Sequence, residues 1–209
     1  MVRLVGLREL NAERTRELIL DAAIALFTEQ GYEEARLDQV AERAGVSIST
    51  LYRYFPTKDL LVLTPVALNG QMAAELAARP VDEPIDVALG HAVMAILRAP
   101  RGNPQRLRQV SQLVDASPAL RSRLREESTR ERLRLEQAIG ERLRRPADDI
   151  YCAMTARMAM SVFELAGLRA RGVEGAVFGG ETFAAAASEV MDALTGEPPA
   201  FPRMTPPEP

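Results

Sequence analysis

Apolar residues along most of this chain recur every three or four positions, which is the spacing of one face of an α-helix. The segment 12–29 is a clear case, because Leu18, Ala22 and Leu26 fall on one side of a helix, next to Phe27. No window shows the sustained alternation of apolar and polar residues that a half-buried β-strand requires. The spacing therefore predicts an all-α protein.

Proline, glycine and capping residues divide this pattern into about nine helices. Gly31 lies where a glycine closes a helix, and Ser47 and Ser117 lie where a serine caps the next one. Pro65 lies inside one apolar segment, where it either kinks a single helix or ends one helix and starts another. The predicted helices cover residues 12–29, 37–44, 48–54, 57–78, 85–98, 105–115, 118–145, 146–171 and 181–195.

The composition excludes several classes of protein. Among 209 residues there are one cysteine, Cys152, and one histidine, His91, so we expect no disulfide, metal site, cofactor or catalytic set. No apolar segment approaches the ~18 residues of a membrane helix, and the first ten residues lack the apolar core of a signal peptide. We therefore expect a cytoplasmic protein that is not an enzyme. Since the net charge is −3, any nucleic-acid site must be a local feature.

Two short predicted helices, 37–44 and 48–54, are joined by a tight turn that contains Gly45, which is typical of a helix-turn-helix. In the second helix Leu51 and Phe55 are the apolar anchors. Its other side chains are left to face outward, where hydroxyl groups suit phosphate oxygens and base edges. These outward residues are Ser47, Ser49, Thr50, Tyr52, Arg53 and Tyr54.

The stretch from Gly31 to Leu61 closely resembles the DNA-binding domain of the TetR-type transcriptional repressors. The matching positions are Gly31-Tyr32, Val40-Ala41, Ala44-Gly45-Val46-Ser47, Thr50-Leu51-Tyr52-Arg53-Tyr54-Phe55-Pro56 and Lys58-Asp59-Leu60-Leu61. The resemblance implies a helix-turn-helix domain at 1–56 and a helical ligand-binding and dimerisation domain at 57–195. A proline-rich tail follows at 196–209.

The resemblance also implies which residues meet DNA, with Lys58 gripping a phosphate at the start of the next helix. The chain departs from the family pattern at Ala35, Arg36 and Ile48, and Arg36 could itself reach a phosphate or a guanine. The candidate DNA-binding residues are Arg36, Ser47, Ser49, Thr50, Tyr52, Tyr54 and Lys58.

The last two predicted helices carry more apolar side chains than one small domain can cover. We expect them to form a four-helix bundle with a second copy of the chain, as in the family that the chain resembles. Two-fold symmetry then requires a palindromic operator. The candidate interface residues are Val162, Leu165, Leu168, Phe183, Ala187, Val190, Met191 and Leu194.

The resemblance places a ligand pocket among the helices between about 57 and 171. The candidate lining residues are Met72, Leu76, His91, Met94, Leu97, Leu113, Met154 and Met158. This set is rich in sulfur and poor in charge, so we expect a small lipophilic effector. His91 could instead be a core or rim histidine that bonds a backbone group.

These features predict a homodimeric repressor that binds double-stranded DNA and is released from it by the effector. The alternative is a helical ligand-binding or adaptor protein without specific DNA binding. In the first case the predicted helix 57–78 joins Lys58 to Met72, ~20 Å away along the axis, with Pro65 as its flexing point.

Overall fold

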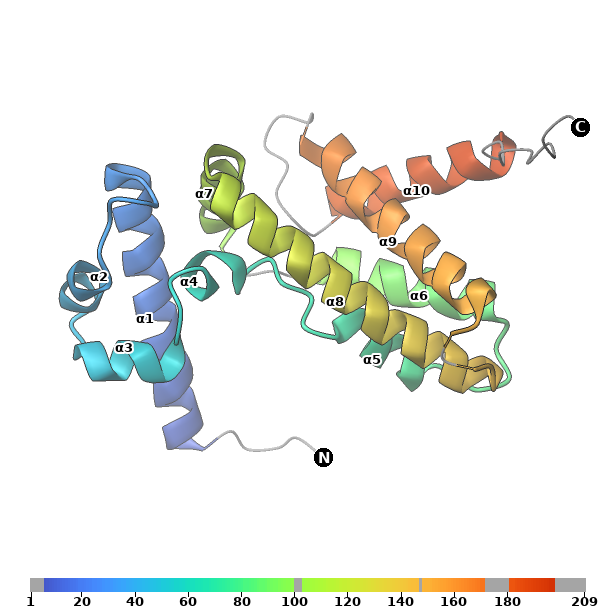
Figure 1. The fold of residues 1–209 in the computed structure, drawn as a ribbon, viewed down its shortest axis with the longest axis horizontal. Coiled ribbons are helices and arrows are strands. Elements are labelled where there is room, and N and C mark those ends of the chain that lie inside the picture. The colour runs from blue at the N-terminus through green and yellow to red at the C-terminus, as the bar shows by residue number, and fades with distance from the viewer. Residues whose placement is uncertain (1–5, 100–102, 147, 172–180, 198–209) are drawn as a thin grey trace, which may run out of the picture.

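The computed structural model describes residues 6–99, 103–146, 148–171 and 181–197 (Figure 1). Every regular element in these ranges is a helix, which confirms the predicted all-α fold. Most of the proline-rich tail expected at 196–209 lies outside them. No helix in the described ranges is long and apolar enough to cross a membrane. The ten helices are α1 (Leu7–Gln30), α2 (Leu37–Arg43), α3 (Ile48–Tyr54), α4 (Leu60–Leu63), α5 (Gln71–Ala78), α6 (Ile85–Arg98), α7 (Pro104–Ala116), α8 (Pro118–Leu143), α9 (Ile150–Arg171) and α10 (Glu181–Gly196).

The prediction of one helix over 57–78 is wrong, because the structure divides it into α4 and α5, separated by residues 64–70. Pro65 lacks the N–H that a continuing helix needs. Asn69 and Gly70 have φ angles of 51° and 84°, in the left-handed region that ends a right-handed helix. The described residues therefore form ten helices instead of about nine, and no single helix can act as a lever between the DNA and the ligand region.

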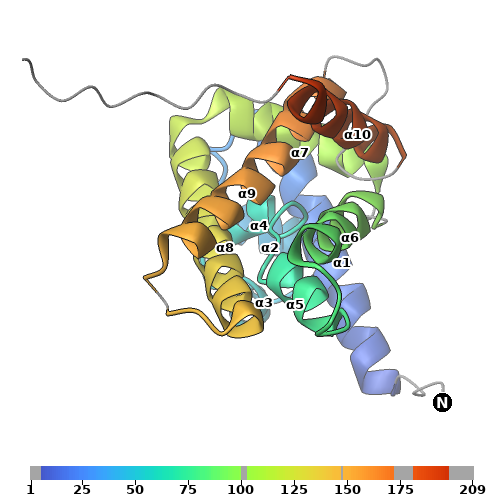
Figure 2. The same cartoon turned by 90° about the vertical axis from the view of Figure 1, so that its right-hand side faces the viewer.

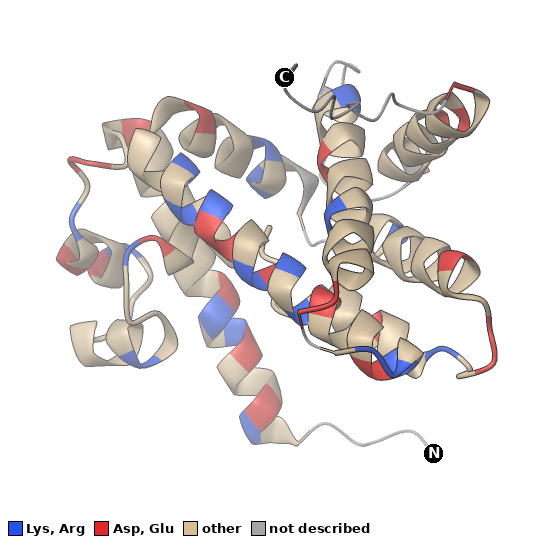
Figure 3. Ribbon diagram, turned by 45° about the vertical axis from the view of Figure 1, so that its right-hand side comes forward, with Lys and Arg blue, Asp and Glu red and all other residues tan. Residues whose placement is uncertain are grey.

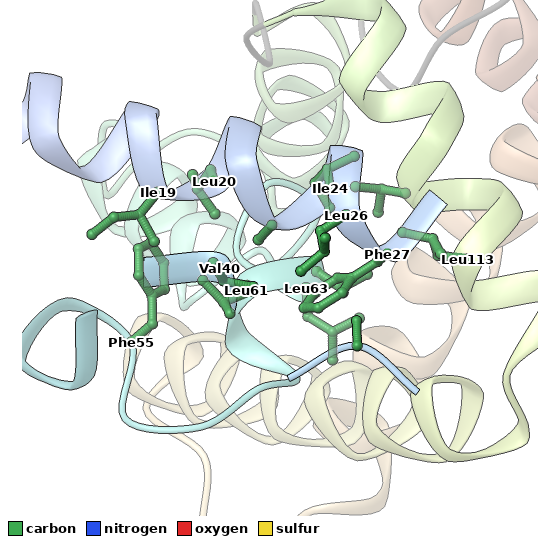
Figure 4. Close-up of a cluster of buried hydrophobic side chains, with 14 of the residues drawn as sticks. Ile19, Leu20, Ile24, Leu26, Phe27, Val40, Phe55, Leu61, Leu63 and Leu113 are labelled. Atoms are coloured by element: carbon green, nitrogen blue, oxygen red, sulfur yellow. The ribbon is translucent and has the colours of Figure 1, made fainter. Parts of the chain in front are cut away.

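The buried side chains form two hydrophobic cores. The first core is made by α1 to α4, α7 and the start of α8, and Figure 4 shows Ile24, Phe27 and Leu61 within it. The second core is made by α5, α6, α9, α10 and the later half of α8. Figure 2 shows how these helices are arranged. The first core thus extends to α4 and α7, past residue 56, where the helix-turn-helix domain was expected to end.

α8 links the two cores because it runs from one to the other (Figure 1). Leu120 near its start is buried in the first core, and Leu135 and Ile139 are buried in the second. Basic and acidic residues alternate along its exposed side (Figure 3), where Arg123 pairs with Glu126 at 2.6 Å. Exposed pairs of this kind contribute little to stability. The contribution of α8 to the fold therefore comes mainly from its buried side chains, which lie near its start and in its later half.

Glu131 of α8 fixes the start of α5. Its side chain is 1% exposed, and its carboxylate accepts hydrogen bonds from the backbone N–H groups of Gly70 at 2.5 Å and Met72 at 3.1 Å. N–H groups at the start of a helix have no acceptor within the helix itself. Glu131 supplies that acceptor from a distant part of the chain and holds α5 against α8.

Candidate functional site

The short helix α3 is held by its apolar side and presents its polar side to solvent. Leu51 and Phe55 are fully buried, and Phe55 lies with Ile19 of α1 in the first core (Figure 4). Ser49 and Tyr52 on the other side are exposed. α3 therefore has the two faces that a helix in a DNA major groove needs.

Three hydroxyl groups gather at the start of α3. The Ser47 oxygen caps the helix by accepting from the Thr50 N–H at 3.1 Å. The same oxygen lies 2.9 Å from the Ser49 hydroxyl and 2.8 Å from the Thr50 hydroxyl. These contacts order the side chains of Ser49 and Thr50 beside the exposed face, while Ser47 itself acts as the cap.

Tyr52, Arg53 and Tyr54 continue the polar side of α3. Tyr52 and Arg53 are exposed and Tyr54 is half-buried, with the Arg53 guanidinium 5.4 Å from the Tyr54 ring centre. Arg53 was not among the predicted DNA-binding residues, although its place beside Tyr52 in an outward-facing segment was a usable signal. It is the cation that α3 presents to solvent on this side.

The two predicted basic contacts already have partners near the helix-turn-helix. Arg36 donates to both carboxylate oxygens of Asp38, at 3.1 and 2.9 Å. Lys58 donates to the backbone oxygen of Glu33 at 3.1 Å and lies 4.7 Å from the centre of the Tyr32 ring, and burial lowers its pKa. An ammonium has three N–H donors, so Lys58 can keep Glu33 and still donate to a phosphate.

Three polar bridges join α1, the loop after α1 and the start of α4 to α7 and α8. Each links a side chain within residues 106–123 to an acidic side chain nearer the N-terminus, over 2.5–3.0 Å. Two of the partners are buried, Ser117 at 4% and Arg106 at 7% exposed. The bridges run from Arg106 to Asp21 and Glu17, from Ser117 to Glu33, and from Arg123 to Asp59. They fix the orientation of α3 relative to α8.

The eight predicted pocket residues lie in three different places and do not form one pocket. Met72, Leu76 and Leu97 are at most 1% exposed in the second core, and Met94 packs against it. Leu113 belongs to the first core (Figure 4) and lines a separate cleft of about 430 Å³ between α1 and α7. The remaining three lie at the surface.

His91, Met154 and Met158 are the surface members of that set. The Met154 and Met158 side chains are exposed on α9. His91 is 54% exposed, and its Nδ1 lies 3.0 Å from a carboxylate oxygen of Glu83. Its partner is therefore the half-buried carboxylate of Glu83, which neither interpretation of the sequence included.

Half of the predicted interface residues are buried within the single chain. Val162, Phe183, Ala187 and Val190 are at most 8% exposed, because α10 packs on α9 and buries them between the two helices. Leu194 is half-buried. Leu165, Leu168 and Met191 remain exposed, at 43%, 63% and 47%. With Met154 and Met158 they form an exposed apolar strip, which we call the α9–α10 strip.

Glu83 makes the stability of the C-terminal part depend on pH. Two hydrogen bonds from Arg79, with a further one from His91, lower the pKa of Glu83 to about 2 from its ordinary 4.5. A pKa that is lower in the folded state stabilises the fold above the unfolded value, and this contribution is lost as the pH falls through the folded value.

We therefore expect Glu83→Gln to flatten the fall in melting temperature between about pH 5 and 2. Thermal unfolding of both proteins in half-unit pH steps measures this. Parallel curves for the variant and the wild type would contradict the role of Glu83.

Two family models match this chain. One, described as bacterial regulatory proteins of the tetR family, covers residues 19–64, which include α2, α3 and the buried half of α1. The other, described as the MftR C-terminal domain, covers residues 83–194, more than half of the chain. The chain therefore belongs to the TetR family of bacterial regulatory proteins.

Curated relatives match part of the chain. The HTH-type transcriptional regulator TcmR of Streptomyces glaucescens is 37% identical over 93 residues, which are 44% of this chain and 41% of TcmR. The HTH-type transcriptional repressor KstR of Rhodococcus jostii is 48% identical over 58 residues, 27% of each chain. The matches thus span less than half the length of these relatives.

Among solved structures, a SmeT–triclosan complex has the same fold. It superposes with a TM-score of 0.54 over 94% of this chain and 98% of the SmeT chain, at 22% sequence identity. At this identity the similarity extends to the arrangement of helices and no further.

Proposed function

We propose that this protein is a homodimeric transcriptional repressor that binds a palindromic DNA operator and leaves it when a small, mostly apolar ligand binds. The observation that carries the proposal is the two-faced α3, with Leu51 and Phe55 buried beneath exposed Ser49 and Tyr52. Its relatives named above are transcriptional regulators, not enzymes. Since its target is bacterial DNA, its place of action is the cytoplasm.

In this proposal the N-terminal and C-terminal parts of the chain have different functions. Residues 1–56 read the DNA through Arg36 and the exposed face of α3, and Lys58, just after this part, adds a phosphate contact. Residues 57–195 bind the ligand and the second subunit. The SmeT complex supports a ligand-binding role, because its helical fold holds a small organic molecule.

The α9–α10 strip supports the dimer. Five large apolar side chains lie exposed there, and burying them against a second copy removes apolar surface from water. Packing the strips of two copies face to face gives a four-helix bundle of α9 and α10 from each chain. The two α3 helices then face DNA about 34–36 Å apart, or a multiple of that, which requires a palindromic operator.

The test is a gel shift on the DNA that flanks the gene of this protein, in a series of salt concentrations with competitor DNA. Specific binding that survives the competitor supports the proposal. No shift on any upstream fragment at low salt contradicts it and favours the alternative, a helical ligand-binding or adaptor protein without specific DNA binding.

We expect Tyr52→Ala to weaken operator binding about tenfold and by the same factor on every operator sequence, because the hydroxyl of an exposed tyrosine on α3 suits a phosphate oxygen and not a particular base. Thr50→Ala should instead lower the affinity for the wild-type operator and reduce the difference in affinity between operators that differ at one particular base pair. Fluorescence anisotropy with single-position operator variants measures both effects.

The matched control is Val81→Ala, an exposed residue in the loop before α6. It should bind the operator as the wild type does. Wild-type affinity of Tyr52→Ala would remove Tyr52 from the DNA-binding surface.

A further inference from the structure

A groove of about 560 Å³ runs between α8 and α9 and ends at the last turn of α7. Its volume is in the range of small-molecule sites. None of the eight predicted pocket residues lines it. Its apolar surface is contributed by all three helices, through Val114, Leu124, Met160, Phe163 and Leu168. The groove can therefore hold the apolar body of a ligand.

The α8 wall of the groove is basic. Arg121, Arg125 and Arg132 lie along one face of α8, with Ser128 and Thr129 between them. Arg121 donates to the backbone oxygen of Asp115, and Arg132 pairs with Glu136 at 3.0 Å. The Arg125 guanidinium has no partner among the described residues. Arg125 is thus the cation on this wall that is free to bind a ligand.

The α9 wall carries the opposite charge in an apolar setting. Glu164 lies among Met160, Phe163 and Leu168 along the groove. No cation of the described residues pairs with it, and partial burial raises its pKa. Glu164 is exposed to solvent at the edge of this apolar lining. Its carboxylate therefore offers a positive group of a ligand in the groove an unshared partner.

Glu164 and Arg125 line the same groove from opposite walls and are not paired with each other. We propose that the groove binds a small zwitterion with an apolar body, about the size of a dipeptide. Its ammonium group pairs with Glu164, its carboxylate pairs with Arg125, and its apolar side chains lie on Phe163 and Leu124. The role of this ligand as an effector rests on the proposed function, whereas the binding of the ligand to the groove does not.

The position of the groove also connects it to the helix-turn-helix. Val114 and Asp115 line the groove, and Ser117, which donates to Glu33, lies two residues after Asp115. Arg123, which donates to Asp59, lies between the groove residues Arg121 and Arg125 in the sequence. A ligand that moves the start of α8 therefore acts on two of the three bridges that orient α3.

Calorimetry on the full-length protein without DNA tests, with four matched probes, whether the ammonium and the carboxylate of the ligand both contribute to binding. They are leucyl-phenylalanine, its C-terminal amide, its N-acetyl derivative, and the N-acetyl amide, which lacks both charges. We expect the zwitterion to bind best and the loss of either charge to weaken binding about tenfold, as for a charge-assisted hydrogen bond.

Two variants assign the charges to their partners. In Arg125→Gln the dipeptide and its amide should bind within about twofold of each other, since the carboxylate has lost its partner. In Glu164→Gln the same should hold for the dipeptide and its N-acetyl form. Arg108→Gln and Glu189→Gln, which change exposed residues outside the groove, should keep the wild-type preferences.

Three results would overturn the proposal. The first is no binding of the dipeptide at millimolar concentration, and the second is equal binding of all four probes. The third is a dimer that dissociates more readily in Arg125→Gln or Glu164→Gln without any probe effect, since these charges would then belong to the subunit interface that shares Leu168. A gel shift on the same preparations tests the proposed function separately, because failure to bind any operator leaves the calorimetric result intact.

Discussion

We expect Phe27→Ala to lower the free energy of unfolding by about 3–5 kcal/mol and to abolish operator binding. Phe27 is fully buried in the first core, and its ring meets the edge of Tyr32 with centroids 5.4 Å apart. It lies where α1 packs against α4 and α7, beside Leu63 (Figure 4). Removing the ring leaves a cavity at the junction that orients α3, so stability and DNA binding should fall together.

Urea unfolding followed by circular dichroism measures the loss, and fluorescence anisotropy on the operator measures the binding. Leu18→Ala is the matched control on the same helix, because Leu18 is 50% exposed, and it should cost less than about 1 kcal/mol. A loss below about 1.5 kcal/mol in Phe27→Ala would contradict a tightly packed junction at this ring.

The second large effect is expected from Glu131→Ala, at about 2–4 kcal/mol. This variant leaves the N–H groups of Gly70 and Met72 without an acceptor in a buried place. Glu131→Gln should cost about half as much, because its amide oxygen can still accept from one of the two groups. Both variants should loosen α5, which begins where the non-helical segment 64–70 ends.

Hydrogen exchange at the amides of α5, together with urea unfolding, tests this cap. Glu141→Ala is the control, since Glu141 is an exposed glutamate on the same helix that accepts only from a side-chain amide of Gln137. Equal stability of Glu131→Ala and Glu141→Ala would show that the cap contributes nothing.

The helix-turn-helix could be predicted closely because its structure depends on neighbours in the sequence. α3 has the predicted bounds 48–54, since its cap, Ser47, bonds the Thr50 N–H three residues away and its anchors, Leu51 and Phe55, are four residues apart. α6 also has its predicted bounds, between Pro84 and Ala99. In both helices, local signals at each end agree with the apolar spacing between them.

The segment 57–78 could not be predicted in the same way. Its apolar spacing continues across residues 64–70, yet the chain turns at Asn69 and Gly70 in the left-handed region. What stabilises a new helix start there is Glu131, whose carboxylate lies 61 positions further along the chain from Gly70. No local pattern carries that contact.

The all-α class, the helix-turn-helix and the polar face of α3 were determined by the sequence itself, because periodicity, caps and anchors act over three or four residues. Tertiary structure decided which apolar faces are covered. On α9 Val162 is buried by α10 while Leu165 and Leu168 stay exposed, although all three lie in the same apolar pattern. It also decided that Arg125 and Glu164 face one groove. The periodicity of apolar residues predicts which side chains share a helix face. The free energy of burying or pairing those side chains depends on a partner helix that is distant in the sequence.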